Sequence, residues 1–331
     1  MEAPGSGWTQ SNATSFLNET AVSANGTNRT QVDYSSDFYI TLPIIYSVIC
    51  AIGLTGNTAV IYVILRAPKM KTVTNMFILN LAIADELFTL VLPINIANHL
   101  LQDWPFGKTM CKVILSIDQY NMFTSIYFLT VMSADRFFVV TATVKSENLP
   151  RRTYRNAKLV SRGVWLLVSV VILPFTIFAS TYVDEFDRNH CSLDFPKPEF
   201  NWLKGSRIYT LVFGFAIPVS TICILYTTML YKLRNMRLNT NGKALDKAKR
   251  KVTIMVFIVL AVCLFCWTPY HLSTVIALTG NLQETPVVVG VSYFITSLSY
   301  ANSCLNPFLY AFLDVNFRNN FQKLLECKVA S

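Results

Sequence analysis

Residues 39–65 read YITLPIIYSVICAIGLTGNTAVIYVIL and contain no Asp, Glu, Lys or Arg. About 20 apolar residues in a helix are enough to cross the hydrocarbon core of a bilayer, so this stretch is long enough for one crossing. Six further segments of similar character follow it. Together they predict seven membrane-spanning helices, at 39–65, 75–101, 110–140, 157–182, 208–233, 252–278 and 285–313.

The composition supports a membrane protein. Of the 331 residues, 53% are hydrophobic and only 14% are charged, which leaves too little polar surface for an ordinary soluble fold. We therefore predict an all-α membrane protein, a seven-helix bundle over residues 38–313. The predicted spans fill nearly all of the chain after residue 38, so no second folded domain is expected.

The first 37 residues have a different character, rich in Ser, Thr, Asn and Gly and without an apolar run. We expect a disordered tail. Glycans are added to Asn-x-Ser/Thr sites only on the lumenal side of a membrane. All such sites in the chain fall in this segment, at Asn12, Asn18, Asn25 and Asn28. They predict a plasma-membrane protein whose glycosylated N-terminus is extracellular. An odd number of spans then places the C-terminus in the cytoplasm.

The distribution of charge gives an independent test of this topology, because Lys and Arg are in excess on cytoplasmic flanks. The predicted spans place about 21 of the 28 Lys and Arg residues on the cytoplasmic side. The net charge of +9 is therefore explained by topology and by attraction to anionic membrane lipids or a cytosolic partner, and it does not indicate nucleic-acid binding.

The eight cysteines separate by compartment, because only external thiols are normally oxidised. Cys111 and Cys191 are the only external pair, so we predict a disulfide between them. Five others lie within the predicted spans and are expected to pack as apolar groups: Cys50, Cys223, Cys263, Cys266 and Cys304.

The remaining thiol, Cys327, ends a segment that begins at residue 314. Phe317, Phe321, Leu324 and Leu325 recur there at helical spacing, which predicts an amphipathic interfacial helix within 314–331. An S-acylated (palmitoylated) Cys327 would anchor this helix. The alternative is a frayed tail with an inert thiol.

Ionisable residues at membrane depth are costly, about 2.5 to 3.5 kcal/mol on insertion scales, so they call for an explanation. Asp118 and Arg136 lie on the third helix, 18 residues apart, so they share one face at a separation of about 27 Å. This arrangement suits a helix that joins an external cationic ligand to an internal switch. The spacing also fits two unrelated structural groups.

A second polar group surrounds Asp85 on the second helix, with Asn302, Ser303 and Asn306 on the seventh and Asn121 and Ser125 on the third. These residues are interpreted as a hydrated cation site. The alternative is a cluster that only holds helices together by hydrogen bonds, worth about 0.6 to 2 kcal/mol each.

An ordered series of motifs runs through the chain after residue 38. The series comprises Gly56-Asn57, Leu81-Ala82-Ile83-Ala84-Asp85, Trp104-Pro105-Phe106-Gly107 before Cys111, Asp135-Arg136, Trp165, Pro218 with Tyr226, Cys266-Trp267-Thr268-Pro269, and Asn306-Pro307-Phe308-Leu309-Tyr310. Over nearly the whole chain after residue 38, this series resembles the rhodopsin-like (class A) G-protein-coupled receptors.

Within that class, residues 116–125 (SIDQYNMFTS) resemble the opioid and somatostatin receptors, while residues 66–97 and the sixth and seventh helices resemble the neuropeptide B/W receptors more closely. The resemblance therefore implies a receptor for neuropeptide B or W, with the first subtype preferred. An opioid-like or somatostatin-like receptor is the alternative.

The resemblance also implies roles for individual residues. Asp118 would pair with a cationic group of the peptide, in a pocket lined by Gln119, Asn95, Tyr270, His271 and Tyr300. The acids around Cys191 would attract a basic ligand or form a solvated loop: Asp184, Glu185, Asp187, Asp194 and Glu199. Asp85, Asn121, Ser125, Asn302 and Ser303 match a sodium site that stabilises the resting state, and no other cofactor or metal is implied.

For activation, the resemblance implies a packing switch at Trp267 and release of Arg136 from Asp135 toward Tyr226 or the G protein. Asn306, Pro307 and Tyr310 would take part in this switch. The implied partners are a heterotrimeric G protein of the Gi/o class, which inhibits adenylate cyclase, with arrestin, receptor kinases and membrane lipids. Two departures from the family pattern affect the switch: Phe137 replaces the usual Tyr, and Cys263 replaces a frequent Phe that packs with Pro218 and Ile126.

Other classes fit less well. A transporter or channel would also bury acids, but the sequence contains no inverted repeat, no pair of broken helices and no ring of like charges. A light sensor needs a Lys in the seventh helix, and residues 285–313 contain none, with Tyr300 at the position. The motifs of common hydrolases and phosphate-binding enzymes are also missing, so we expect no enzyme.

Overall fold

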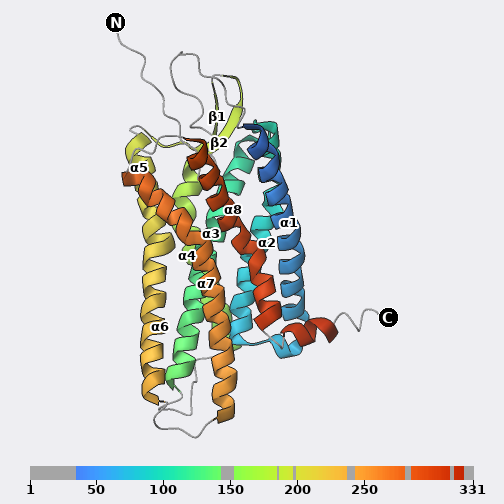
Figure 1. The fold of residues 1–331 in the computed structure, drawn as a ribbon, viewed down its shortest axis with the longest axis vertical. Helices are drawn as coiled ribbons and strands as arrows, with labels where there is room; N and C mark the ends of the chain where they lie inside the picture. The colour runs from blue at the N-terminus through green and yellow to red at the C-terminus, as the bar shows by residue number, and fades with distance from the viewer. Residues whose placement is uncertain are drawn as a thin grey trace.

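The computed structural model describes residues 35–142, 153–184, 186–196, 199–236, 243–279, 285–313 and 317–323. The four predicted glycosylation sites, Glu185 and Cys327 lie outside these residues, so glycosylation and acylation stay predictions. Figure 1 shows an elongated bundle of roughly parallel helices.

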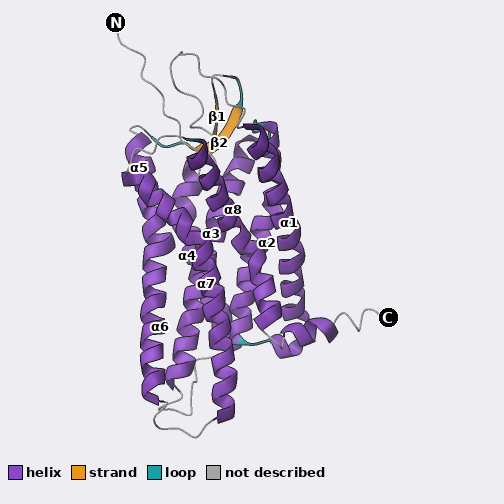
Figure 2. Ribbon diagram, viewed as in Figure 1, coloured by secondary structure: helices purple, strands orange, loops and turns teal. Residues whose placement is uncertain are grey.

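The predicted helices are confirmed within a few residues at most ends, and they are nearly the only secondary structure in the described residues (Figure 2). A single rod is formed by α5, a π-helical stretch at Val212–Ala216, and α6. The helices are α1 (Ser35–Arg66), α2 (Val73–Leu101), α3 (Gly107–Ala142), α4 (Tyr154–Phe178), α5 (Glu199–Leu211), α6 (Ile217–Met236), α7 (Lys243–Thr279) and α8 (Pro286–Leu313).

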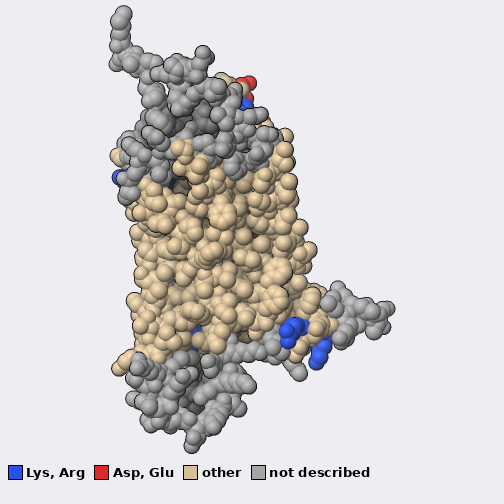
Figure 3. Space-filling model, in the orientation of Figure 1, with Lys and Arg blue, Asp and Glu red and all other residues tan. Residues whose placement is uncertain are grey.

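The bundle surface fits a bilayer. Six helices in the described part of the chain are long and apolar enough to cross a membrane. The remaining long helix, α3, carries Asp118, Gln119 and Asn121 in its first half and Asp135 and Arg136 in its second half, which lower its hydropathy. Figure 3 shows a broad uncharged belt on one face, with Lys, Arg, Asp and Glu confined to its two ends.

A β-hairpin covers one end of the bundle and was not predicted. Strand β1 (Ala179–Val183) pairs antiparallel with β2 (Asn189–Leu193), with Thr181 opposite Cys191. The fourth helix therefore ends at Phe178, and its predicted extension to residue 182 is wrong. The disulfide between Cys111 and Cys191 is confirmed, with Cα atoms 5.5 Å apart. The disulfide holds β2 against α3. There β2 provides hydrogen-bond partners for the segment after α4, which therefore forms strand β1.

The short helical segment at residues 317–323 confirms part of the predicted C-terminal helix. Figure 1 shows it lying across the end of the bundle opposite the hairpin. Phe317 is buried and its ring is stacked on that of Phe321, with centroids 6.3 Å apart. The apolar side of this segment therefore faces the bundle, as an interfacial helix requires.

Close helix contacts depend on glycine at two places on α1. A Cβ atom on Gly56 would lie 2.9 Å from Pro307 of α8, and one on Gly53 would lie 2.4 Å from Thr89 of α2. Only a residue without a side chain permits these approaches. They place α1 against both neighbours, beside the polar residues of α2 and α8.

This packing predicts the effect of Gly56→Ala. The new methyl group must push α8 away at Pro307, at a cost of about 1–3 kcal/mol, which we expect as a lower midpoint of thermal inactivation of the solubilised protein. The matched control is Gly163→Ala in α4, where an added Cβ meets nothing within 4 Å. Equal midpoints for the two variants would contradict the close approach of α1 and α8.

Candidate ligand pocket and polar core

Asp118 lies in the half of α3 nearest the hairpin, and its carboxylate lacks a full set of hydrogen bonds. Its Oδ1 atom is buried and has no hydrogen-bond partner among the residues that the structure describes. The side chain interacts electrostatically with the hydroxyls of Tyr46 and Tyr270, which come from α1 and α7. A buried carboxyl without a donor is unfavourable unless a cation or donor reaches it, so this position is suited to a cationic ligand group.

Aromatic side chains of α7 form one wall beside this acid. The rings of Trp267 and Tyr270 are 5.9 Å apart edge to face, and His271 packs 4.6 Å from Phe215 of the π-helical stretch. His271 is buried, and neither ring nitrogen has a partner within the described ranges. A small cavity of about 10 Å³ adjoins this wall, lined by Met122, Ile126, Gly214, Phe215, Cys263, Leu264, Trp267 and His271.

Other predicted pocket residues are less closely grouped. Tyr300 packs its ring against Tyr46 and Phe88, at centroid distances of 5.2 and 4.9 Å, within an apolar cluster of α1, α2 and α8. Gln119 follows Asp118 and has a buried Oε1 atom without a partner in the described structure. Asn95 is half-buried on α2. Their roles in binding remain predictions.

The predicted group around Asp85 comes together in the middle of the bundle. Asp85 is fully buried, and its two carboxylate oxygens accept hydrogen bonds from Asn121 of α3 at 3.1 Å and Asn306 of α8 at 2.8 Å. Asn121 also donates to the hydroxyl of Ser303 at 2.9 Å. Asn57 of α1 donates to the backbone oxygen of Ser303 at 2.9 Å. Four helices therefore meet at this one polar core.

Two members of the predicted sodium site are not used by these bonds. The Ser125 hydroxyl and the whole amide of Asn302 are buried and unpartnered within the described part of the chain. Each lies one helical turn from a residue that bonds Asp85, because Ser125 follows Asn121 by four positions and Asn302 precedes Asn306 by four. Orphaned oxygens beside a buried carboxylate fit the oxygen ligands that hard cations prefer.

The end of the bundle opposite the hairpin holds Arg136, which is 4% exposed. Its guanidinium donates to the carboxylate of Asp135 and, at 2.6 Å, to the hydroxyl of Thr74 in α2. Tyr226 of α6 packs its ring 5.6 Å from Phe257 of α7, and Tyr310 is buried. Arg136 is thus bonded within its own end of the bundle and tied to α2.

The two departures from the family pattern can now be placed. Lys232 of α6 lies over the ring of Phe137 at 5.1 Å, so this ring links α3 to α6 without a hydroxyl. Cys263 is buried and lines the small cavity together with Ile126 and Trp267. A thiol fills less space than the Phe of the family pattern, so it fills this region less completely.

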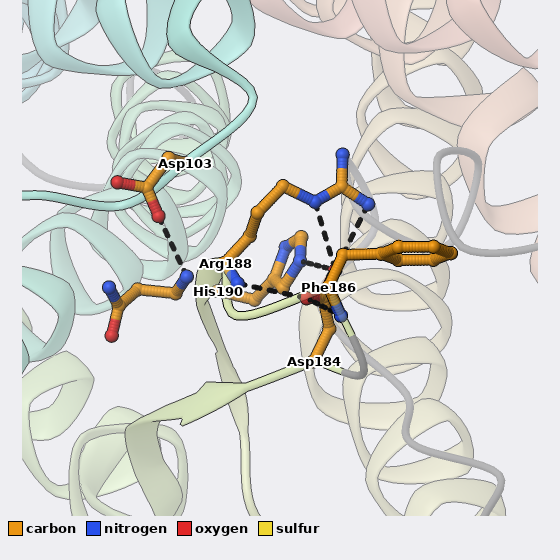
Figure 4. Close-up of polar contacts among 6 residues, drawn as sticks. Asp103, Asp184, Phe186, Arg188 and His190 are labelled. Carbon is orange, nitrogen blue, oxygen red and sulfur yellow. Dashed lines mark hydrogen bonds and ion pairs between the residues drawn. The ribbon is translucent and has the colours of Figure 1, made fainter.

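Among the acids around the hairpin, Asp184 is engaged by neighbouring residues of the turn (Figure 4). Asp184 accepts hydrogen bonds from the backbone N–H groups of Phe186 and Arg188, at 2.8 and 2.9 Å, and pairs with the side chains of Arg188 and His190. Partial desolvation acts to raise the pKa of Asp184, but these hydrogen bonds outweigh it and hold the pKa well below its usual value.

Asp103 is used in the same way, because it accepts the backbone N–H of Asn189 at 2.7 Å. Asp187 and Asp194 are exposed. Asp184 and Asp103 thus bond backbone groups of the hairpin, whereas Asp187 and Asp194 are the more exposed acids among the described residues of this region. Asp184 therefore has a structural role in the hairpin turn, and attraction of a basic ligand by these acids stays a prediction.

Some contributing residues were not found from the sequence. Thr74 was not predicted, because the sequence does not distinguish a Thr that bonds Arg136 from one on α2 that faces lipid or water. Lys112 of α3 donates to two backbone oxygens of α4, and only its position one residue after Cys111 could have drawn attention to it. Helical spacing alone does not reveal which neighbour a polar residue meets.

Comparison with known proteins agrees with this geometry. Residues 56–310 match the family described as 7 transmembrane receptor (rhodopsin family). The chain therefore belongs to this family of class A G-protein-coupled receptors and is a multi-pass membrane protein, not an enzyme. The seven-helix prediction is confirmed, with α5, the π-helical stretch and α6 counted as one crossing.

Named relatives narrow the group. The chain is 65% identical to the neuropeptides B/W receptor type 2 of Homo sapiens, over 87% of each chain. It is 64% identical to the human type 1 receptor, over 88% of this chain and 89% of that one. The somatostatin receptor type 2 of Mus musculus is 42% identical over 93% of this chain and 83% of its own. These identities confirm the resemblance to the neuropeptide B/W group, and they do not separate its two subtypes.

The hairpin geometry predicts that Asp184→Asn loosens the turn. Loss of the charge removes the ion pairs to Arg188 and His190, so we expect amide hydrogen exchange over residues 186–190 to become about tenfold faster. The control is Asp187→Asn, which removes an exposed acid from the same turn. If both variants exchange alike, Asp184 does not organise the hairpin.

Proposed function

We propose that this chain is a receptor for a peptide of the neuropeptide B/W kind, with its hairpin end outside the cell. The observation that carries the proposal is the buried Oδ1 atom of Asp118, which has no hydrogen-bond partner among the described residues and lies near Tyr270 of the aromatic wall. The relatives at 64–65% identity are named for neuropeptides B and W, which supports this ligand class over opioid or somatostatin peptides.

Charge placement supports the orientation. The described basic residues at the end opposite the hairpin are Arg66, Lys71, Arg136, Arg155, Lys158, Arg162, Lys232, Arg318 and Lys323, whereas acids and bases are mixed at the hairpin end. An excess of Lys and Arg marks the cytoplasmic side of membrane proteins. The clustered glycosylation sequences in the N-terminal tail agree with this orientation.

In the proposed mechanism, a cationic group of the peptide pairs with Asp118 and the remainder presses on the wall at Trp267. A ligand shifts the equilibrium toward the active state only if it binds that state better. The small cavity next to Cys263 is lined on one side by Trp267. At the cytoplasmic end, Arg136 leaves Asp135 and Thr74 and reaches toward Tyr226 or the G protein as α7 swings on Pro269.

A sodium ion fits the polar core of the resting state. The carboxylate of Asp85 would hold it, with the Ser125 and Asn302 oxygens, which lack partners in the described part of the chain, as further ligands and Asn121 and Ser303 fixing the carboxylate. A bound cation supplies the positive charge that a buried carboxylate lacks.

On the cytoplasmic side we propose coupling to a G protein of the Gi/o class, followed by receptor kinases and arrestin. The sequence from Lys232 to Lys251 is rich in Lys and Arg, which supports an acidic or anionic partner. The helix at 317–323 lies at the same end and supports membrane attachment, which acylation of Cys327 would strengthen.

The ligand class is tested in cells that express the chain, by adding neuropeptides B and W beside opioid and somatostatin peptides. We expect neuropeptides B and W to suppress cyclic AMP, and pretreatment with a toxin that inactivates Gi/o to remove the response. A response only to an opioid or somatostatin peptide would move the chain to that alternative, and silence to all four would reject a peptide receptor of this group.

The anchor is tested by Asp118→Asn. We expect the concentration for half-maximal response to rise by about 100-fold or more at unchanged surface level, because the peptide cation loses a desolvated charge partner. Asp194→Asn, which removes an exposed acid from the same end, should leave the response near that of the wild type. A normal dose response from Asp118→Asn would remove the ionic anchor.

The sodium proposal predicts that added sodium chloride weakens agonist binding, compared with the same concentration of a large organic cation. Asp85→Asn should abolish this difference, because the amide cannot neutralise the ion. Glu86→Gln is the matched control, since the neighbouring acid Glu86 is bonded to Thr58 on the α1 side at 2.7 Å. Persistent sodium sensitivity in Asp85→Asn would place the ion elsewhere.

A further inference from the structure

The outer end of α3 is fastened to the α4–hairpin segment by two consecutive residues. Cys111 forms the disulfide to Cys191 in β2. The ammonium group of Lys112 donates to the backbone oxygens of Thr176 and Ile177, at 2.8 Å each. These two oxygens lie in the last turn of α4, which ends at Phe178, so β1 begins just beyond the residues that Lys112 holds.

The last four carbonyl groups of a helix have no partner within the helix, and they form the negative end of its dipole. A Lys side chain that reaches two of them neutralises that end with charge and with hydrogen bonds. Lys112 is half-buried at this junction, where water competes less well for the carbonyls than at an open surface. It therefore caps α4 from a different helix.

Lys112 also begins a polar stripe along α3. Ser116, four residues later, shares a hydrogen bond with the Thr176 hydroxyl at 2.7 Å, and Tyr120, after another four, bonds the hydroxyl of Ser169. Residues spaced by four lie on one helix face, so this stripe faces α4 along two turns. It fixes how far α3 is rotated about its own axis relative to α4.

That rotation decides where Asp118 points. At 100° per residue, Asp118 lies about 200° around the helix from the middle of the stripe, so it faces away from α4 into the bundle. Cys111 is seven residues before Asp118, about two turns, and therefore lies on the same face. The disulfide thus attaches the hairpin to the face of α3 that carries Asp118. The polar stripe bonds the opposite face of α3 to α4.

We propose that Lys112 is a positioning residue for peptide recognition. By capping the end of α4, Lys112 fixes the direction in which Asp118 points and the place where the hairpin begins. The proposal rests on the receptor function proposed above. Because Ser116 and Tyr120 keep their own bonds to α4, loss of Lys112 leaves the bundle folded but allows the outer turns of α3 and the hairpin to shift.

The first test compares Lys112→Met, Lys112→Arg and Lys108→Met with the wild type, using neuropeptide W as agonist and surface staining of each variant. Methionine keeps the length of the side chain without its charge, whereas arginine can donate to both carbonyls. Lys108 is exposed one turn earlier on α3, so its substitution controls for the loss of one positive charge at the same end.

We expect Lys112→Met to raise the half-maximal concentration by about 10- to 100-fold, with surface level and maximal response within about twofold of the wild type. Lys112→Arg should recover most of the potency, and Lys108→Met should retain it. Wild-type potency of Lys112→Met overturns the proposal. So does an equal loss in Lys108→Met, which would mean an effect of charge alone.

A second measurement does not depend on the peptide. A cysteine introduced by Asp118→Cys is labelled with a water-soluble cationic thiosulfonate reagent, and its rate is compared with and without Lys112→Met, after subtraction of labelling in the chain without that cysteine. We expect the rate to change by about fivefold or more in the Lys112→Met background and to stay unchanged with Lys108→Met. Equal rates overturn the positioning role, even if the wild type ignores neuropeptide W and the proposed function itself fails.

Discussion

The carboxylate of Asp85 is the constraint around which the bundle is arranged. A charged or strongly polar group at membrane depth must find partners inside the protein, because lipid offers none. Asp85 obtains them from α3 and α8, through Asn121 and Asn306, and Asn57 extends the set to α1 through the backbone of Ser303. These bonds require the four helices to lie close together, and Gly56 allows the approach where α1 meets Pro307. The polar core thus explains the presence of small and amide-bearing residues in segments that are otherwise apolar.

The two ends of α3 differ in a way that suits a receptor. Toward the hairpin, Asp118 has a carboxylate oxygen with no protein partner in the described structure, so an arriving cation finds an unsatisfied group. At the other end, Arg136 is bonded to Asp135 and Thr74. In the proposed mechanism, a ligand cation binds at Asp118. At the other end, Arg136 must break its bonds to Asp135 and Thr74 before it can contact a new partner. The polar core lies between them, and in the described structure its Ser125 hydroxyl and Asn302 amide have no partners, which supports the proposed cation site.

Much of this could be predicted from the sequence, because bilayer thickness sets helix length and because buried acids are costly enough to be informative. The disulfide followed from sorting cysteines by compartment, and the members of the Asp85 group followed from their positions in the middle of three helices. The hairpin could not be predicted, because residues 179–182 carry no charge and could have continued α4. Their strand conformation depends on β2, which is held in place by Cys191. The engagement of Asp184 could not be foreseen either, because it depends on the turn that brings Arg188 and His190 back to it. Likewise, the packing of Tyr300 against Phe88 and the contact of Lys112 with α4 depend on helix rotation, which periodicity leaves open.

The proposed mechanism requires that the Asp118 pocket is coupled to the end of the bundle that holds Arg136. Coupling between two binding sites is reciprocal, so a G protein bound at one end must raise the affinity for agonist at the other. The direct measurement is the affinity of labelled neuropeptide W for membranes containing the receptor and Gi, before and after a non-hydrolysable GTP analogue releases the G protein. We expect the affinity to fall by about fivefold or more on adding the nucleotide. The same affinity in both conditions would contradict a coupled pocket and switch.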